Sequence, residues 1–556
     1  MAQDSRYLGS ARLIALCTLV SRVTGLVRDM ALNHVYGQNW VQDAFNYGFL
    51  IPNLFRRLFG EGALSAVFVP TFMEVLDRRG RPAAWVLLGR VAGLMGLVLV
   101  VLTILLELGV LAFWVFVPSG RMATLQLGLT GVMLPFMIGA CLLALFSSIL
   151  NCLEHFTVPA LLSTVLNVMV FSGVVLVGPL LGERLEQQIY GVAVCVLLTG
   201  IIQLAIIMPV LRRHGVQFRL SLNHRDPDLR QMARIFVPVL LGQGVLLFNV
   251  FFDAQICTFL TRGPQDPAAF SFFGSQVLYP LAQGALSAVN NAQRLYQFPL
   301  GVLAISLATA ALPLFSLYAS RGDTAGLRST VAQSLRLAIF VGLPSGIVVI
   351  ILAEPIVSLL FEHGKYGSDA TARAAYVLRF YGFGMAAFCC QHILLRGFYS
   401  LKDTLTPMRI SCYLVALNVA LNVTLVWHPA IREAAFGIST SITACLHVGI
   451  SVLLLRRRLH GRIGATVVLQ SAAMTAIATA AGGGAAWALL NWTTGLDLSA
   501  IGVTGARLVC VFGPLAGCVL VFFAVAKLLR MPEIGWLMTR RATSSSKGGG
   551  QPGPSR

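Results

Sequence analysis

Long apolar runs recur along nearly the whole chain and set the strongest limit on its fold. A membrane-spanning helix needs about 20 mostly apolar residues, and such runs follow one another from residue 8 to residue 529. Of the 556 residues, 57% are hydrophobic and 11% charged, whereas about 25% of a typical soluble domain is charged. The chain is therefore predicted to be an all-α polytopic membrane protein, because helices satisfy their own backbone hydrogen bonds in lipid.

The apolar runs predict about fourteen transmembrane helices. Their expected ranges are 8–33, 43–75, 84–117, 123–150, 158–181, 188–211, 232–260, 269–319 (broken or in two pieces), 332–361, 371–399, 405–427, 434–455, 464–490 and 501–529.

The basic residues agree with this count. With fourteen spans, the two termini and the even-numbered connections lie on one side of the membrane, and the odd-numbered connections lie on the other. The first group contains 25 Lys and Arg in or near it, and the second contains 5. Cytoplasmic loops carry such an excess, so both termini are predicted to be cytoplasmic. The same bias explains most of the net charge of +19, and no nucleic-acid partner is expected.

Two similar segments indicate an internal repeat. Both "LNCLEHFTVP" and "FYSLKDTLTP" end in a proline, Pro159 and Pro407, and both precede a Leu-Asn-Val, at 166–168 and 417–419. The spacing matches six helices, and an even number gives two halves of one orientation. We predict two six-helix lobes in parallel repeat around a central cavity, with two further C-terminal helices. The expected divisions are an N-lobe 1–220, a C-lobe 221–460, the two extra helices 461–530, and a disordered basic tail 531–556.

Charged residues inside the apolar runs are the candidate functional residues. Each costs about 2.5–3.5 kcal/mol at the centre of a spanning helix, so those in mid-helix are expected to face protein or a wet cavity. Arg suits phosphate because its planar fork donates hydrogen bonds in pairs. The set contains five Arg and three acids, which leaves two positive charges for an anionic ligand; a purely structural ion-pair network is the alternative. Its members are Arg22, Arg28, Asp29, Asp43, Arg56, Arg57, Glu61 and Arg294.

Asp253 is a lone carboxylate in the seventh predicted span, and Asn249 lies one turn before it. The pattern fits a proton or Na⁺ site, or a partner for an Arg, and the sequence leaves these open. The chain contains no G-x-x-x-x-G-K-[ST] motif, so ATP hydrolysis is not expected, and no cofactor is predicted. Six other Arg near helix ends are expected to reach the membrane surface: Arg90, Arg234, Arg336, Arg373, Arg379 and Arg507.

Four segments give the chain a family resemblance. They are "SRVTGLVRD", "DAFNYGFLIPNLFRRLFGEGALSAVFVPTF", "QRLYQFPLGVLAISLATAALP" and "FYSLKDTLTP". They resemble the MurJ (MviN) family, proposed lipid II flippases of bacterial peptidoglycan synthesis in the MOP exporter superfamily. The resemblance spans about residues 8–460.

The resemblance implies a flippase that moves lipid II, an undecaprenyl-pyrophosphate-linked saccharide-peptide, from the cytoplasmic to the outer leaflet of the bacterial inner membrane. It implies alternating access, and a groove for the lipid tail at 461–530. By motif, Arg28 and Arg294 would contact the pyrophosphate, with Asp29 holding Arg28. Arg22, Arg56 and Arg57 would line the inner cavity, and Asp43 and Glu61 would act in gating or pairing. Membrane lipids would be further partners, and a monomer is expected to suffice.

The chain departs from the family pattern at Gln293 and Gln297, where acidic residues are common. Three other functions were weighed: a flippase for another polyprenyl-pyrophosphate-linked saccharide, a MATE-like cation exporter, and a membrane enzyme acting on lipid-linked sugars. The excess of intramembrane Arg disfavours a cation exporter. The predicted outer loops are short, which disfavours the enzyme.

Overall fold

The computed structural model describes residues 2–59, 64–117, 120–216, 221, 227–272, 274–459, 461 and 464–538, and nearly all of them are helical. The first half contains α1 (Ala2–Tyr36), α2 (Trp40–Leu58), α3 (Leu64–Phe116), α4 (Arg121–Met133), α5 (Phe136–Cys152), α6 (Thr157–Ser172), a π-helical turn η2 (Gly173–Val177), α7 (Gly178–Leu180), α8 (Leu185–Arg213) and α9 (Pro227–Phe259).

A two-stranded hairpin separates these helices from the second half. It consists of β1 (Ala269–Phe272) and β2 (Ser275–Leu278). The later elements are α10 (Ala285–Pro299), η3 (Leu300–Ala304), α11 (Ile305–Ser320), α12 (Thr324–Ile351), α13 (Ala353–Phe361), α14 (Ser368–Ser400), α15 (Leu405–Leu425), α16 (Ala434–Arg458), α17 (Ala465–Thr494), η4 (Ser499–Ile501), α18 (Gly502–Leu528) and α19 (Pro532–Met538).

The prediction of an all-helical multi-pass membrane protein is confirmed. Ten helices of the described part are long and apolar enough to cross a membrane, or eleven if the pair α4 and α5, bent by 41° at Pro135, counts as one span. All fourteen predicted segments contain helix, but 43–75 covers α2 and the first part of α3, 84–117 covers the rest of α3, and 158–181 covers α6, η2 and α7. The helix α2 is not among these ten, because its 19 residues include three charged ones, Asp43, Arg56 and Arg57.

The helix predicted at 269–319 is wrong at its start. Residues 269–278 form an antiparallel hairpin in which Ala269 pairs with Leu278 and Phe272 with Ser275. At the turn Gly274 has φ 82°, a conformation that glycine adopts without strain. The apolar letters of "AFSF" and "SQVL" resemble helix in a hydropathy pattern, yet they belong to strands too short to cross lipid.

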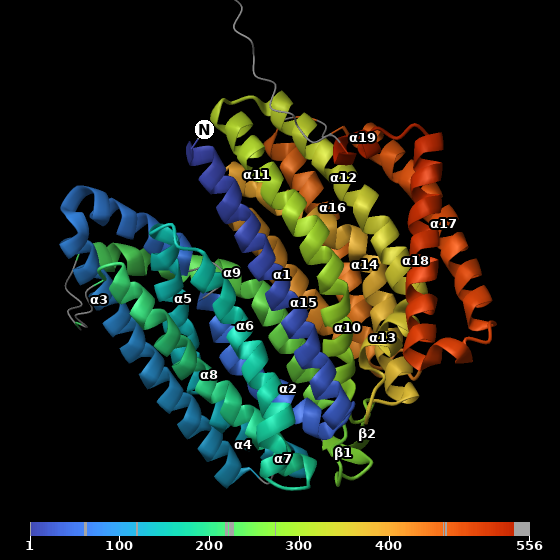
Figure 1. The fold of residues 1–556 in the computed structure, drawn as a ribbon, viewed down its shortest axis with the longest axis horizontal. Coiled ribbons are helices and arrows are strands. Elements are labelled where there is room, and N and C mark those ends of the chain that lie inside the picture. The colour runs from blue at the N-terminus through green and yellow to red at the C-terminus, as the bar shows by residue number, and fades with distance from the viewer. Residues whose placement is uncertain are drawn as a thin grey trace, which may run out of the picture. The chain divides into compact units, whose positions relative to one another are not determined.

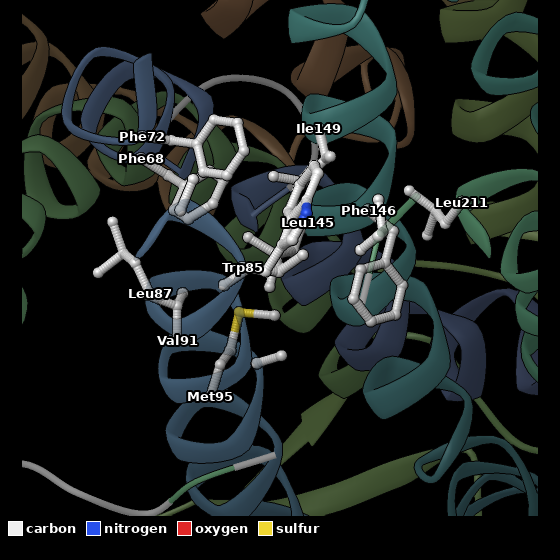
Figure 2. Close-up of a cluster of buried hydrophobic side chains, with 14 of the residues drawn as sticks. Phe68, Phe72, Trp85, Leu87, Val91, Met95, Leu145, Phe146, Ile149 and Leu211 are labelled. Atoms are coloured by element: carbon white, nitrogen blue, oxygen red, sulfur yellow. The ribbon is translucent and has the colours of Figure 1, made fainter. Parts of the chain in front are cut away.

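The predicted boundary between the second and third spans is a sharp reversal inside α3. Gly80 has φ 78° and ψ 176°, and Pro82 follows, so the helical hydrogen bonding ends there. Phe72 before the reversal packs on Trp85 after it, with ring centroids 5.9 Å apart. Figure 2 shows these rings gathered with Leu145 and Ile149 of α5 in one buried cluster.

The chain forms two compact units. The first contains residues 1–298, 352–384 and 402–451, and the second contains 299–351, 385–401 and 452–556. In the first unit α6 packs on α1, α8 on α5, and α15 on α9. The lobe boundaries drawn from the sequence at residues 220 and 460 stay a prediction.

In the second unit α17 and α18 lie side by side, and α12 packs on α17 (Figure 1). The segment 531–556, expected to be disordered, begins with the helix α19, and residues 539–556 lie outside the described part. Glu533 of α19 is fully buried and accepts hydrogen bonds from Arg336 Nε at 2.8 Å and Ser471 Oγ at 2.6 Å. These contacts of Glu533 fix α19 to α12 and α17, and they give Arg336 an ion-pair partner that was not expected from the sequence.

Candidate functional site

A pocket of about 180 Å³ lies within the first unit. One face each of α1, α2 and α10 supplies most of its lining, and α6 and α9 complete it. Four of the predicted site residues line it: Arg28, Asp29, Arg57 and Arg294. Three Arg against one Asp make this a cationic pocket, as the sequence predicted.

The centre of the pocket is a three-residue charge cluster that joins α1 to α10. Arg28, which is 9% exposed, donates to Asp29 Oδ1 from Nε at 2.9 Å and from Nη2 at 2.6 Å. Arg294 Nε forms an ion pair with Asp29 Oδ2 at 3.0 Å. The Arg294 side chain remains 55% exposed, so much of its guanidinium is available to a ligand. Asp29 thus orients both Arg and neutralises only one of them.

Asn167 of α6 is a further member of this cluster. Its Oδ1 accepts from Arg28 Nη1 at 3.0 Å, and its Nδ2 donates to Ser21 O at 3.0 Å and Thr24 Oγ1 at 3.2 Å. These bonds fix the amide, so the third side of Arg28 is also held. The sequence marked Asn167 only as part of the repeat signal Leu-Asn-Val, and that repeat was the one clue to its importance.

The other basic residues of the cluster predicted for the first two spans are spread along the helices. Arg57 lines the pocket. Arg56 Nε donates to Asn53 Oδ1 at 3.0 Å, one turn earlier on α2, and neither Arg56 nor the half-buried Arg22 lines the pocket. Glu61 lies outside the described residues.

Asp43 is fully buried and binds the start of α10. Its carboxylate accepts from the backbone N–H of Gly284 and of Ser287, both at 2.7 Å, and from Ser287 Oγ at 2.6 Å. Backbone N–H groups at a helix start lack partners within the helix, and a carboxylate there also gains from the helix dipole. Asp43 is therefore a cap supplied by α2 to α10.

Asp253 lies in a second polar cluster of the first unit. Asn422 Nδ2 donates to its Oδ1 at 2.6 Å, and the amide of Asn418 lies 2.9 Å from the same oxygen. Asn249, the predicted neighbour, is more distant at 3.5 Å. Ser439 of α16 donates in turn to Asn422 Oδ1.

The partners of Asp253 in the described part of the chain are thus carboxamides rather than an Arg. There, too, no three His, Cys, Asp or Glu side chains gather in a manner that would hold a metal ion. A hard cation at Asp253 would have to use amide oxygens, which are suitable ligands for such ions.

Two further ion pairs were not recognised from the sequence. Arg373 of α14 binds Glu433 at the start of α16, and its Nη1 donates to Gln283 O at 2.8 Å, directly before the start of α10. Arg379 of α14 lies 3.3 Å from Glu354. Both Arg were expected only to extend to the membrane surface. Arg373 and Asp43 thus both bind the start of α10: Arg373 donates to the carbonyl of Gln283, and Asp43 accepts from the N–H of Gly284.

Comparison with known proteins agrees with the fold. The family model described as lipid II flippase MurJ matches residues 32–501. A probable lipid II flippase MurJ from Vibrio cholerae is 29% identical over 82% of this chain and 83% of its own length. Its counterpart from Bdellovibrio bacteriovorus is 31% identical over 75% of this chain and 76% of its own length.

Solved structures give the same fold. A lipid II flippase MurJ in an inward closed conformation matches with a TM-score of 0.73 at 20% identity, covering 94% of this chain and 99% of its own. An inward-facing MATE family transporter of the MOP superfamily matches with a TM-score of 0.63 at 13% identity, over 81% of this chain and 98% of its own. The fold is therefore one that this chain shares with a solved transporter of the MOP superfamily. Within it, the chain belongs to the MurJ family.

Proposed function

We propose that this protein is a flippase that moves lipid II from the cytoplasmic to the outer leaflet by alternating access. The observation that carries the proposal is the cluster of Arg28, Asp29 and Arg294 in the pocket. Two Arg share one carboxylate, and Arg57 adds a third positive charge to the lining. Arg28 and Arg294 together carry one positive charge more than Asp29 neutralises, and this surplus suits a pyrophosphate, since Arg donates hydrogen bonds in pairs to phosphate oxygens.

The pocket reduces the cost of moving the headgroup. Bringing an unpaired anion into hydrocarbon is prohibitive, whereas preformed guanidinium donors replace its water. Arg28 is already buried and held on three sides, so it needs no reorganisation to receive a phosphate. The lipid tail remains in the bilayer throughout, and the sequence resemblance assigns residues 461–530 to it.

Two related functions remain as alternatives. A flippase for another polyprenyl-pyrophosphate-linked saccharide uses the same charge complementarity, and only substrate comparison distinguishes it. A MATE-like cation exporter shares the fold but would place its cargo beside three Arg, which repel it.

Placement in the bacterial inner membrane with both termini in the cytoplasm is part of the proposal, as is function as a monomer. The excess of basic residues near alternate connections supports this orientation. Reporter fusions test it: those after Ser221 and Arg457 should lie inside, and one after Asp266 outside. An outside signal after Arg457 would contradict the fourteen-span topology.

The function is tested by complementing a bacterium depleted of its own MurJ and measuring exposure of lipid II at the outer surface. The wild-type chain should restore growth and exposure, and Arg28→Ala and Arg294→Ala should not, although both insert in the membrane. Arg78→Ala is the matched control, because the Arg78 side chain is 74% exposed and pairs with Glu74 on the same helix. Full activity of Arg28→Ala at normal expression would remove the anion-pocket argument.

A further inference from the structure

Part of the pocket is lined by carboxamides rather than by charged side chains. Asn33 of α1, Gln42 and Asn46 of α2, and Asn290 and Asn291 of α10 line it there, and we refer to these five residues as the amide wall. Carboxamides offer both donors and acceptors without net charge. The wall therefore has the chemistry to bind hydroxyl and amide groups, whereas the Arg cluster has the chemistry to bind phosphate.

The amide wall holds a buried acceptor with no partner. Gln42 is 3% exposed, and its Nε2 donates to Asn33 Oδ1 at 2.9 Å. Its Oε1 is buried and lacks a hydrogen bond among the described residues. A buried acceptor without a partner destabilises the protein, and a ligand N–H or O–H at this place would satisfy it.

The orientation of Gln42 follows from its neighbours. Asn33 and Asn291 bond reciprocally, Nδ2 of each to Oδ1 of the other, at 3.2 and 3.1 Å. Asn33 Oδ1 accepts from both Asn291 Nδ2 and Gln42 Nε2, so the nitrogen of Gln42 is the end that faces Asn33. The oxygen of Gln42 is consequently directed away from the network.

The spacing along the helices separates the two parts of the pocket. Asn33 is five residues beyond Arg28 on α1, a rise of about 7.5 Å at 1.5 Å per residue. On α2, Gln42 and Arg57 are fifteen residues apart, or about 22 Å. Along α1 and α2 the carboxamides therefore lie toward Asp43 and the Arg lie farther from it, whereas on α10 Asn290 and Arg294 are only one turn apart. A ligand with an anionic part and a neighbouring neutral polar part fits this lining.

We infer that the amide wall is the subsite for the neutral saccharide part of the headgroup, with the Gln42 oxygen accepting a hydrogen bond from a sugar hydroxyl or N-acyl N–H. The inference rests on the proposed function, because it assumes that the pyrophosphate binds at Arg28 and Arg294. It makes Gln42 a specificity-determining residue. A polyprenyl pyrophosphate without sugars leaves Gln42 unpaired, and sites with unpaired buried polar groups discriminate strongly against such analogues.

The contacts of Gln293 agree with this assignment. Its Nε2 donates to Tyr381 Oη at 3.1 Å, and Tyr381 stacks on Tyr296 with ring centroids 4.6 Å apart. The amide at 293 thus holds α10 against α14 without adding a negative charge beside Arg294. The cationic centre keeps its surplus for the pyrophosphate, and the wall stays neutral for the saccharide.

The test compares two probes on the full-length purified protein: lipid II and undecaprenyl pyrophosphate. The wild-type protein should bind lipid II at least about tenfold more tightly. Gln42→Leu should weaken lipid II binding about tenfold, the effect of one lost buried hydrogen bond, and leave undecaprenyl pyrophosphate binding unchanged. Asn290→Ala, at a half-buried position, should likewise weaken lipid II binding and leave undecaprenyl pyrophosphate binding unchanged. It provides a second test of the subsite in case Gln42→Leu does not fold.

The controls separate this inference from the proposed function. Arg28→Ala should weaken binding of both probes, and Gln333→Leu, at an exposed site on α12, should weaken neither. Equal weakening of both probes by Gln42→Leu and Asn290→Ala, or equal wild-type affinity for both probes, would overturn the saccharide subsite and leave the flippase proposal standing. Failure of the wild-type protein to bind either probe would overturn both.

Discussion

Arg28 Nη1 and Asn167 Oδ1 are joined by a 3.0 Å hydrogen bond between α1 and α6. Asn167 belongs to one Leu-Asn-Val of the sequence repeat, and Asn418 belongs to the other. The Asn418 amide lies 2.9 Å from Asp253 Oδ1, and α15 packs on α9 as α6 packs on α1. Each half of the chain therefore places the same asparagine beside an ionisable residue of that half's first helix. The charge differs: Arg in one half, Asp in the other.

Asn167→Leu should reduce flipping about tenfold while Arg28 keeps its bonds to Asp29. The reason is the loss of one hydrogen bond to a buried charged group, about 1.5–3 kcal/mol. Flipping of labelled lipid II in proteoliposomes measures the effect. Asn151→Leu, at an exposed site, is the control, and an unchanged rate in Asn167→Leu would show that Asp29 alone is enough to hold Arg28.

Arg28→Lys should be nearly as inactive as Arg28→Ala. Arg28 bonds Asp29 through Nε and Nη2 and Asn167 through Nη1, and the compact ammonium of Lys has no equivalent planar fork. Complementation together with a membrane-insertion assay measures this. Growth at the wild-type rate would mean that a positive charge suffices at this site and that fork geometry does not matter.

The sequence predicted the residues of the cationic pocket better than their contacts. A charge in an apolar run is visible because it is costly, so Arg28 and Arg294 were found. The partners of Asp43 were not, because Gly284 and Ser287 are ordinary letters about 240 positions later. Polar pairing across helices depends on where the helices pack, which hydropathy does not encode.

Helix ends show the same limit. The break near Gly80 was predicted because a short basic segment with Arg78, Arg79 and Arg81 separates two apolar runs. The hairpin at 269–278 was missed because its residues are as apolar as those of a helix. The helix α19 was missed because a basic, Gly/Ser-rich tail follows it. The helix α19 is held by the contacts of Glu533 with Arg336 and Ser471, and the local sequence does not predict these contacts.

Asp43→Ala should destabilise the protein and slow flipping. The change leaves the buried N–H groups of Gly284 and Ser287 without their acceptor, at about 1–3 kcal/mol for each unsatisfied group. Thermal unfolding of the purified protein measures the loss. Asp323→Ala is the matched control, because Asp323 accepts from Gly326 N at the start of α12 but is exposed, so water replaces it. Equal losses in the two variants would argue against a special role for the Asp43 cap.

Glu533→Ala should lower the thermal stability of the second unit strongly, by about 3–5 kcal/mol, because it leaves Arg336 as a largely buried, unpaired charge. The double variant Arg336→Met with Glu533→Leu should recover much of that loss, since apolar groups replace both charges. Thermal unfolding measures both variants. A double variant that is no more stable than Glu533→Ala would mean that α19 needs the ion pair itself in order to dock.

Asp253→Asn separates a coupling site from a structural carboxylate. The Asp253 partners in the described part of the chain are amides, which favours a bound proton or Na⁺ over pairing with an Arg. If Asp253 binds Na⁺, the wild-type rate should rise with Na⁺ at fixed pH, and if it binds a proton the rate should follow pH at fixed Na⁺. In both cases Asp253→Asn should abolish the dependence, because the amide has no charge to hold a cation.

The measurement is lipid II flipping in proteoliposomes with Na⁺ and pH varied independently. Asn422→Leu is the companion variant: it removes the 2.6 Å donor to Asp253 Oδ1 and should shift the ion dependence without abolishing it. Unchanged activity and unchanged ion response in Asp253→Asn would make Asp253 a structural partner of α15.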